Sequence, residues 1–198
     1  NFGSSNNKAD YFLSGTWSKK AISEATKLIN VNTIASSEDS NFSYAPNPLD
    51  WNVSDDASYV HYCPNETIQG VAIHKIPEIK KPLIADMSSV ILSEPLDVSK
   101  YSLIYAGAQK NIGPAGLTMV IVDKNYMEEE DDTLPNILRY SKHSQAGSML
   151  NTPPTFAWYM AGKVFKWIKK SGGLNFFKEQ NHKNCLLYTS DAADDRNW

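Results

Sequence analysis

Long apolar segments are missing from this sequence. A membrane-spanning helix needs roughly 18–20 consecutive apolar residues, and every apolar run here is much shorter. The opening segment, residues 1–10, is polar and lacks the charged head and apolar core of a secretion signal. We therefore expect a soluble, cytoplasmic protein with no membrane partner.

Cysteine is also scarce, and positive charge is not concentrated in any segment. The chain has two cysteines, Cys63 and Cys185, in neither metal-ligand spacing nor a disulfide framework. We expect both to be reduced thiols, with no metal site and no catalytic cysteine. Lysine and arginine number 19 against 22 acidic residues, and no long basic stripe could neutralise a phosphate backbone. Nucleic acid is therefore not an expected partner.

The composition itself is that of an ordinary globular protein. The 198 residues are 41% apolar and 21% charged, which is typical of a folded domain. Five short apolar runs, each bounded by proline, glycine, asparagine or aspartate, indicate strands at residues 59–62, 69–73, 83–85, 102–105 and 117–122. Their continuous hydrophobicity is typical of strands covered on both faces. The sequence therefore predicts an α/β fold, with a mixed, mostly parallel sheet flanked by helices.

Helical spacing occurs in two segments. Residues 18–28 predict a surface helix, and residues 153–170, between Pro-Pro and Gly-Gly, predict a long one. We expect the long helix to use its apolar side chains in a core or an interface; they are Phe156, Trp158, Met160, Val164, Phe165 and Trp167. Residues 36–56 are interpreted as an extended connection. The acidic residues 127–132 are interpreted as a solvated loop.

Two polar side chains stand where open α/β sheets place functional groups, just beyond the carboxyl ends of strands. Asp86 ends the run Pro-Leu-Ile-Ala-Asp, and Lys110 follows an apolar run within a segment rich in small residues. Taken singly, they are typical of a helix cap and of an exposed loop. Together they match pyridoxal phosphate (PLP), which needs a lysine amine for its Schiff base and a carboxylate facing its pyridine nitrogen. The small residues follow neither the dinucleotide nor the Walker pattern.

Four blocks of sequence make this pattern specific. They are residues 60–68 (VHYCPNETI), 84–89 (IADMSS), 106–117 (AGAQKNIGPAGL) and 147–156 (GSMLNTPPTF), preceded by a fifth at 15–21 (GTWSKKA). In order and approximate spacing they resemble the phosphoserine aminotransferases, which are class-V aminotransferases of PLP fold type I. The resemblance covers roughly residues 8–184 and implies the large domain of that fold.

The resemblance implies a role for each matching residue. Lys110 would be catalytic, holding PLP and then moving the proton between the substrate α-carbon and the cofactor C4′. Asp86 would pair with the pyridinium nitrogen, and Trp17 would stack on the ring. Thr67 would hydrogen-bond the ring oxygen or nearby atoms, and Gln109 would donate to the cofactor phosphate.

A homodimer is implied as well. Asn151 and Thr152 would reach the cofactor phosphate of the neighbouring subunit, so that each active site is shared across the interface. Without the resemblance, this pair before Pro153 indicates only a helix cap, and capping is a second expected role. We assign no function to the histidines and interpret three of them as ordinary polar or packing residues: His61, His74 and His143.

The implied reaction transfers an amino group from glutamate to 3-phosphohydroxypyruvate, giving O-phosphoserine and 2-oxoglutarate in serine biosynthesis. Amination of a phosphorylated hydroxythreonine precursor in pyridoxine biosynthesis is a related role. Such substrates call for arginine forks, yet the chain has only Arg139 and Arg196, so the substrate anchors are expected outside this segment. Two alternatives stay open: another fold-type-I PLP enzyme, or an inactive truncated fragment. A cysteine desulfurase would need a mobile catalytic cysteine, which neither cysteine provides.

The two ends carry their own expectations. The chain begins without methionine inside an expected loop, and residues 185–195 resemble the translation of a sequencing adapter. We therefore expect residues 1–184 to be a partial PLP-binding large domain, truncated at both ends. Residues 185–198 are expected to be a non-native tail. Such a chain is expected to be inactive alone.

Overall fold

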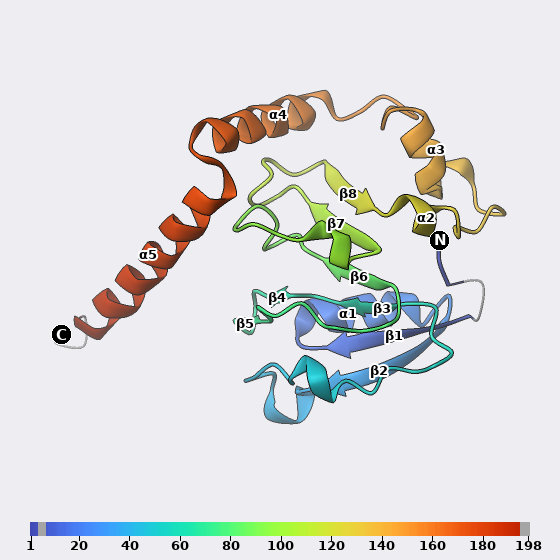
Figure 1. Cartoon of the computed structure of the whole chain (residues 1–198), viewed down its shortest axis with the longest axis horizontal. Helices are drawn as coiled ribbons and strands as arrows, with labels where there is room; N and C mark the ends of the chain where they lie inside the picture. The colour runs from blue at the N-terminus through green and yellow to red at the C-terminus, as the bar shows by residue number, and fades with distance from the viewer. Residues whose placement is uncertain (4–6, 195–198) are drawn as a thin grey trace.

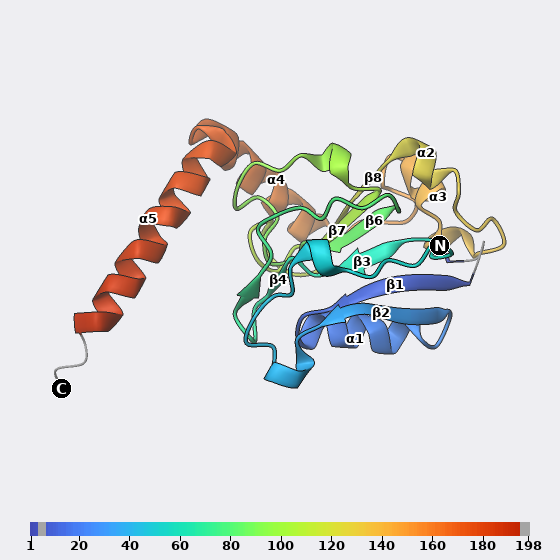
Figure 2. The same ribbon diagram turned by 60° about the horizontal axis from the view of Figure 1, so that its bottom comes forward.

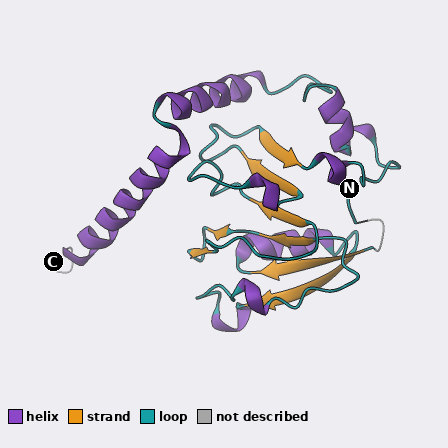
Figure 3. Cartoon of the chain, in the orientation of Figure 1, coloured by secondary structure: helices purple, strands orange, loops and turns teal. Residues whose placement is uncertain are grey.

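A six-stranded sheet forms the centre of the molecule (Figures 1 and 3). The computed structural model describes residues 1–3 and 7–194, with side chains up to residue 186. The strand order is β2-β1-β3-β6-β7-β8, and every neighbouring pair is parallel except β7 and β8. In chain order the strands are β1 (Lys8–Leu13), β2 (Asn30–Ser36), β3 (Val60–Tyr62), β6 (Leu83–Asp86), β7 (Leu103–Gly107) and β8 (Thr118–Val122). The predicted mixed, mostly parallel sheet is confirmed.

Four of the five predicted strands lie in this sheet, as β3, β6, β7 and β8. The fifth prediction, residues 69–73, is wrong as a sheet member, because only β5 (Val71–Ala72) is extended there and it pairs with β4 (Asn65–Glu66) in a separate hairpin. Sequence reasoning missed β1 and β2. Asp10 interrupts the apolar pattern of strand β1. Its side chain is fully buried and accepts hydrogen bonds from Asn32 and Ser54. Burial of a paired carboxylate leaves no apolar signal in the sequence.

The helices lie around this sheet. The predicted surface helix is α1 (Thr16–Ala25), and the predicted long helix is α4 (Thr155–Lys170). Two short helices, α2 (Lys124–Met127) and α3 (Tyr140–Gln145), follow the last strand, and α5 (Gly173–Asp194) extends away from the sheet in both Figures 1 and 2. Single 3-10 turns occupy η1 (Glu38–Ser40), η2 (Pro48–Asp50), η3 (Val98–Lys100) and η4 (Asn136–Leu138).

Helix α5 bears on the expected tail. Its backbone continues through residue 194, and residues 195–198 lie outside the described part of the chain. The boundary at residue 184 and the foreign origin of residues 185–198 stay predictions. Among the described residues, none of the helices combines the length and the hydrophobicity that crossing a membrane requires.

Within this chain, helix α4 does not bury the aromatic side chains of its predicted apolar stripe, and their use in an interface stays a prediction. Its buried side chains are Ala157, Ala161 and Ile168, whereas Phe156 is 70% exposed and Trp167 is 57% exposed. Small residues allow close packing: a Cβ added at Gly113 would lie 3.6 Å from the backbone nitrogen of Ala161. The apolar stripe therefore does not serve the core of this chain, and its large side chains face outward.

Side chains alternate between the two faces of the sheet and build two clusters. On one face Phe12, Tyr62 and Ile104 pack with residues from the loops and with Ala161 of α4. On the other face Ile84 and Leu103 pack with Phe2 and Tyr126. The larger cluster anchors the carboxyl ends of β6 and β7, from which the predicted site residues emerge.

The acidic segment 127–132 is only partly the solvated loop that its charge indicated. Glu130 is buried, and it accepts hydrogen bonds from the Arg139 Nε at 3.1 Å and from the Ser141 backbone nitrogen at 3.2 Å. A guanidinium and a backbone donor compensate for the loss of water around this carboxylate. The interpretation as a solvated loop is therefore wrong at Glu130, because its partners come from outside the run.

Candidate cofactor site

A cavity of about 350 Å³ opens at the carboxyl ends of β6 and β7. Asp86 is the last residue of β6, and Lys110 lies three residues beyond the end of β7 at Gly107. Because parallel strands end at the same edge of a sheet, the two side chains come to one place. The full lining is Trp17, Cys63, Asn65, Asp86, Ser88, Ser89, Gln109 and Lys110. Four predicted site residues therefore share one cavity.

The Asp86 carboxylate is fixed by a local turn. Its Oδ1 accepts hydrogen bonds from the Ser88 backbone nitrogen at 3.0 Å and from the Ser88 Oγ at 2.6 Å. The Ser88 hydroxyl in turn accepts from the Gly107 backbone nitrogen at 3.0 Å, which ties β6 to β7. Asp86 Oδ2 accepts no hydrogen bond from the described residues. One carboxylate oxygen is therefore held in place, and the other is available to a ligand.

Gln109 and Lys110 lie in the loop that follows β7. A Cβ added at Gly107 would lie 2.4 Å from the Gln109 Oε1, so a side chain at position 107 would displace the amide. Gln109 and Lys110 are exposed, whereas Ala108 and Ile112 on either side are buried and anchor the segment in the core. No ion pair to Lys110 occurs among the described residues. Its amine is therefore available to a ligand.

Trp17 enters the cavity from the first turn of α1. Its indole Nε1 donates a hydrogen bond to the Thr67 Oγ1 at 3.1 Å, although the two residues are 50 positions apart. The ring is 39% exposed, and the Lys20 ammonium lies 4.8 Å from its centroid. Thr67 does not line the cavity, but its hydroxyl fixes the ring that does.

Asn151 and Thr152 lie apart from this cavity. Both are exposed, and neither is among the residues lining it. Their expected capping of α4 is wrong: the helix begins at Thr155 after Pro154, and no side chain caps it. A contact of this pair with a second subunit stays a prediction.

Cys63 lines the cavity but is not a nucleophile of the kind a desulfurase needs. Burial is the main cause that raises the pKa of its thiol, and the Asp86 carboxylate adds to the effect. The thiolate is therefore disfavoured. Among the described residues no three histidine, cysteine, aspartate or glutamate side chains are grouped to hold a metal ion.

Sequence reasoning missed three residues that build this site. Ser88 fixes Asp86, while Glu66 and Gln69 hold the first turn of α1. The segment Asn-Glu-Thr was interpreted only through Thr67. A polar residue that is buried and bonded looks the same in a sequence as one on the surface, so no signal pointed to Glu66.

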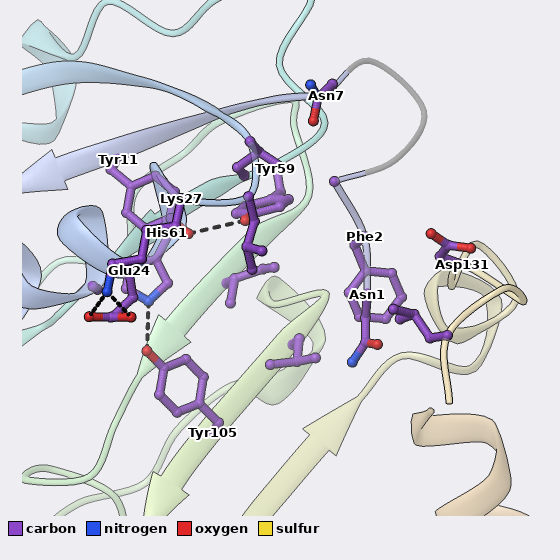
Figure 4. A pocket seen from close by; sticks show the side chains of 18 of the residues that line it. Asn1, Phe2, Asn7, Tyr11, Glu24, Lys27, Tyr59, His61, Tyr105 and Asp131 are labelled. Carbon is purple, nitrogen blue, oxygen red and sulfur yellow. Dashed lines mark hydrogen bonds and ion pairs between the residues drawn. The ribbon is translucent and has the colours of Figure 1, made fainter. Parts of the chain in front are cut away.

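A larger cavity, of about 940 Å³, lies over the face of the sheet that carries Ile84 and Leu103. None of the predicted site residues line it. Figure 4 shows its polar wall: Tyr11 and Tyr59 share a hydrogen bond of 3.0 Å, and the His61 Nε2 meets the Tyr105 hydroxyl at 2.9 Å. Burial lowers the pKa of His61 to about 4, which keeps the imidazole neutral at pH 7. The interpretation of His61 as a packing residue agrees with this environment.

Comparison with known proteins places this geometry in a family. A family model described as Aminotransferase class-V matches residues 5–189. The chain belongs to this family. Class-V aminotransferases use PLP. Here the ends of β6 and β7 bring a carboxylate and a lysine, and the first turn of α1 brings an indole, to one cavity.

Curated relatives of this class-V aminotransferase segment include phosphoserine aminotransferases. Phosphoserine aminotransferase of Hahella chejuensis is 53% identical over 184 residues, which are 92% of this chain and 51% of that protein. Phosphoserine aminotransferase of Idiomarina loihiensis is 49% identical over 191 residues, covering 95% of this chain and 53% of that protein. The chain therefore spans about half the length of the curated relatives it matches.

Solved structures agree with the class-V assignment. Phosphoserine aminotransferase from Bacillus circulans subsp. alkalophilus superposes with a TM-score of 0.92 and 41% identity, covering 96% of this chain and 53% of that one. The PLP-bound phosphoserine aminotransferase from Trichomonas vaginalis superposes with a TM-score of 0.85 and 40% identity, covering 91% and 52%. The expected fold of the PLP-dependent transferases is confirmed.

Proposed function

We propose that this chain is the cofactor-binding part of a phosphoserine aminotransferase. The whole enzyme would transfer the amino group of glutamate to 3-phosphohydroxypyruvate, giving O-phosphoserine and 2-oxoglutarate. The observation that carries the proposal is the convergence of Lys110, Asp86 and Trp17 on one cavity. The names of the relatives supply the substrates.

The cavity fits PLP by size and by the chemistry of its lining. Its volume of about 350 Å³ falls within the roughly 300–1,000 Å³ of small-molecule sites. PLP offers an aldehyde, a pyridine ring and a phosphate, and the site offers an amine, an unpaired carboxylate oxygen and an amide. When bound, PLP supplies an aromatic ring that accepts electrons from the substrate α-carbon.

Each predicted side chain would contact a particular part of that cofactor. The Lys110 amine would hold the cofactor through its aldehyde and would then carry the proton to and from the substrate α-carbon. The Asp86 carboxylate would face the ring nitrogen and keep it protonated, because a nearby negative charge favours the cationic ring. Trp17 would cover the ring, Thr67 would donate to its oxygen, and Gln109 would donate to the phosphate.

The Thr67 hydroxyl has the right polarity for this role. Its oxygen accepts from the Trp17 indole at 3.1 Å, so its own hydrogen remains free to be donated. A ring oxygen carrying negative charge is the acceptor that such a hydrogen would meet. The same contact therefore supports both Thr67 and Trp17 as residues that bind the cofactor.

The described residues supply little of a substrate pocket. The guanidinium of Arg139 donates to Glu130 and to the Asp132 carbonyl, away from the cavity. Arg196 lies outside the described residues. Anchors for the carboxylates and the phosphate of the substrates are therefore proposed to lie in the half of the relatives that this chain does not cover.

Activity can be tested with a hybrid enzyme, in which residues 5–184 of this chain replace the matching segment of the Hahella chejuensis relative. We expect the hybrid to consume glutamate only when 3-phosphohydroxypyruvate is present. The 198-residue chain alone is expected to aggregate or fold poorly and to show no turnover, because it exposes large apolar side chains. Light scattering measures aggregation, and a coupled 2-oxoglutarate assay measures turnover. A hybrid with PLP but no phosphohydroxypyruvate-dependent turnover would contradict the substrate assignment.

A homodimer is the second part of the proposal, and α4 supports it. Phe156, Tyr159 and Trp167 are exposed on this helix, which follows Asn151 and Thr152 directly. Exposed aromatic groups of this kind mark interfaces between proteins. The pair Asn151 and Thr152 would then lie at the subunit boundary and reach the partner's cofactor.

The interface can be tested by adding charge to α4. We expect Phe156→Asp to convert the dimeric hybrid largely to monomer, since burying an aspartate without a partner costs several kcal/mol, about 3 or more. The matched control is Ser23→Asp on exposed α1, which adds the same charge and should stay dimeric. Light scattering reports the mass. An unchanged dimer in Phe156→Asp would exclude this face.

A further inference from the structure

The first turn of α1 is capped by another part of the chain. The first backbone N–H groups of a helix have no partner within the helix, and here the residue before the helix is Gly15, which has no side chain to offer. The Glu66 Oε2 accepts from the Trp17 nitrogen at 2.8 Å, and the Glu66 Oε1 accepts from the Ser18 nitrogen at 2.7 Å. The Gln69 Oε1 accepts from the Thr16 nitrogen at 3.1 Å.

This contact is close and sheltered from water. Glu66 is fully buried, and a Cβ added at Gly15 would lie 2.7 Å from both the Glu66 Cδ and the Gln69 Oε1. Glycine is therefore needed at position 15 so that the hairpin of β4 and β5 can reach the helix. A carboxylate at a helix N-terminus is favoured by the helix dipole, and more so where water is excluded.

The cap helps to fix the orientation of the Trp17 side chain. Glu66 holds the main chain of Trp17, and the next residue, Thr67, holds the Trp17 indole at 3.1 Å. Two consecutive residues of the hairpin thus fix both the backbone and the ring of the residue that enters the cavity. Contacts at both ends leave the indole little freedom to turn away from the site.

We propose that Glu66 is a positioning residue, which fixes the Trp17 ring over the cofactor by capping α1 from the β4–β5 hairpin. The inference rests on the proposed function, because it takes Trp17 to face PLP. Glu66 itself does not line the cavity, so its effect on the cofactor passes through Trp17. The effects of changing the two residues on PLP affinity should therefore not be independent.

A double-mutant cycle in the hybrid tests this dependence, with PLP as the probe. Glu66→Gln keeps the volume but sets an amide N–H₂ against a backbone N–H, while Trp17→Leu removes the ring. We expect each single change to raise the dissociation constant for PLP by about 3- to 10-fold, the contribution of one aromatic stacking contact. The double variant should be no weaker than Trp17→Leu alone, because the cap has no ring left to position.

Two further readouts separate positioning from general stability. Amide hydrogen exchange at Trp17 and Ser18 should speed up in Glu66→Gln, and the circular dichroism induced in bound PLP should weaken. Gly15→Ala, which pushes the helix from the hairpin, should reproduce both effects. Glu130→Gln is the matched control: it removes another buried carboxylate, bonded to Arg139 and Ser141 and remote from the cavity, and it should leave PLP affinity unchanged.

Other outcomes would contradict the positioning role of Glu66, the proposed function, or both. The positioning role would be overturned if the losses of PLP affinity in Glu66→Gln and Trp17→Leu multiplied in the double variant. It would also be overturned if Glu66→Gln left both amide exchange and PLP affinity unchanged. An unaltered affinity in Trp17→Leu, with borohydride still fixing PLP to Lys110, would overturn the inference and leave the proposed function standing. Failure to fix PLP to Lys110 in the parent hybrid would overturn both.

Discussion

Lys110→Ala is expected to abolish transamination in the hybrid enzyme. The lysine amine is proposed both to bind the cofactor aldehyde and to carry the proton between two carbon atoms, and alanine can do neither. Proton transfer by a positioned side chain contributes about 100- to 10,000-fold, so kcat should fall by on the order of 1,000-fold or more. Borohydride reduction followed by peptide mass spectrometry should find PLP on Lys110 in the parent and on no residue of the variant.

The control for this experiment is Lys100→Ala. Lys100 is an exposed lysine at the end of η3 and does not line the cavity, so its removal should change neither turnover nor labelling. A small primary amine added to Lys110→Ala should restore part of the rate, because the missing group is an amine. A borohydride-stable adduct that persists in Lys110→Ala would assign the attachment to another residue.

Asp86→Asn should leave PLP bound and slow turnover strongly. The amide keeps the shape of the side chain but cannot stabilise a positive charge on the ring nitrogen. An opposite charge at close range shifts a pKa by about 1–3 units, so loss of this carboxylate lowers the protonated fraction of the ring, and with it the rate, by about 10- to 1,000-fold. Steady-state kinetics and the spectrum of bound PLP measure the two effects separately.

Asp97→Asn is a closely matched control. Asp97 makes the same turn as Asp86: its Oδ1 accepts from the Ser99 nitrogen at 3.1 Å and from the Ser99 Oγ at 2.6 Å, against 3.0 Å and 2.6 Å for Asp86 and Ser88. Asp97 does not line the cavity. A defect shared by both variants would reflect the turn, whereas near-normal turnover of Asp86→Asn alone would remove the carboxylate from the mechanism.

The meeting of Asp86 and Lys110 in one cavity was predictable from local sequence. Asp86 ends one apolar run and Lys110 follows another, so strand ends alone brought the two together. The blocks around them resemble one family, and that resemblance added Trp17, Thr67 and Gln109. Thr67 contacts Trp17 without lining the cavity, and Asn151 and Thr152 lie apart from it.

The fold was less predictable wherever burial and polarity coincide. Asp10 lies within β1 and Glu130 within an acidic run, yet both are buried because partners from other segments bond them. Helix α4 shows the reverse, since the small Ala157 and Ala161 are buried while the large Phe156 is exposed. The type of a residue predicts the free-energy cost of burying its side chain, but not which residues of the folded chain will contact it.

The sequence by itself determined the run of strand-forming segments, the α/β class, and the lysine and carboxylate that meet at the strand ends. Only the tertiary structure decided that Glu66 caps a helix 48 residues earlier in the chain and that Thr67 holds the indole of Trp17. The physical reason is that local patterns set backbone conformation, whereas a hydrogen bond between distant segments depends on how the chain crosses the sheet. Glu66 has no sequence signature, because its two partners are backbone N–H groups that every helix leaves free.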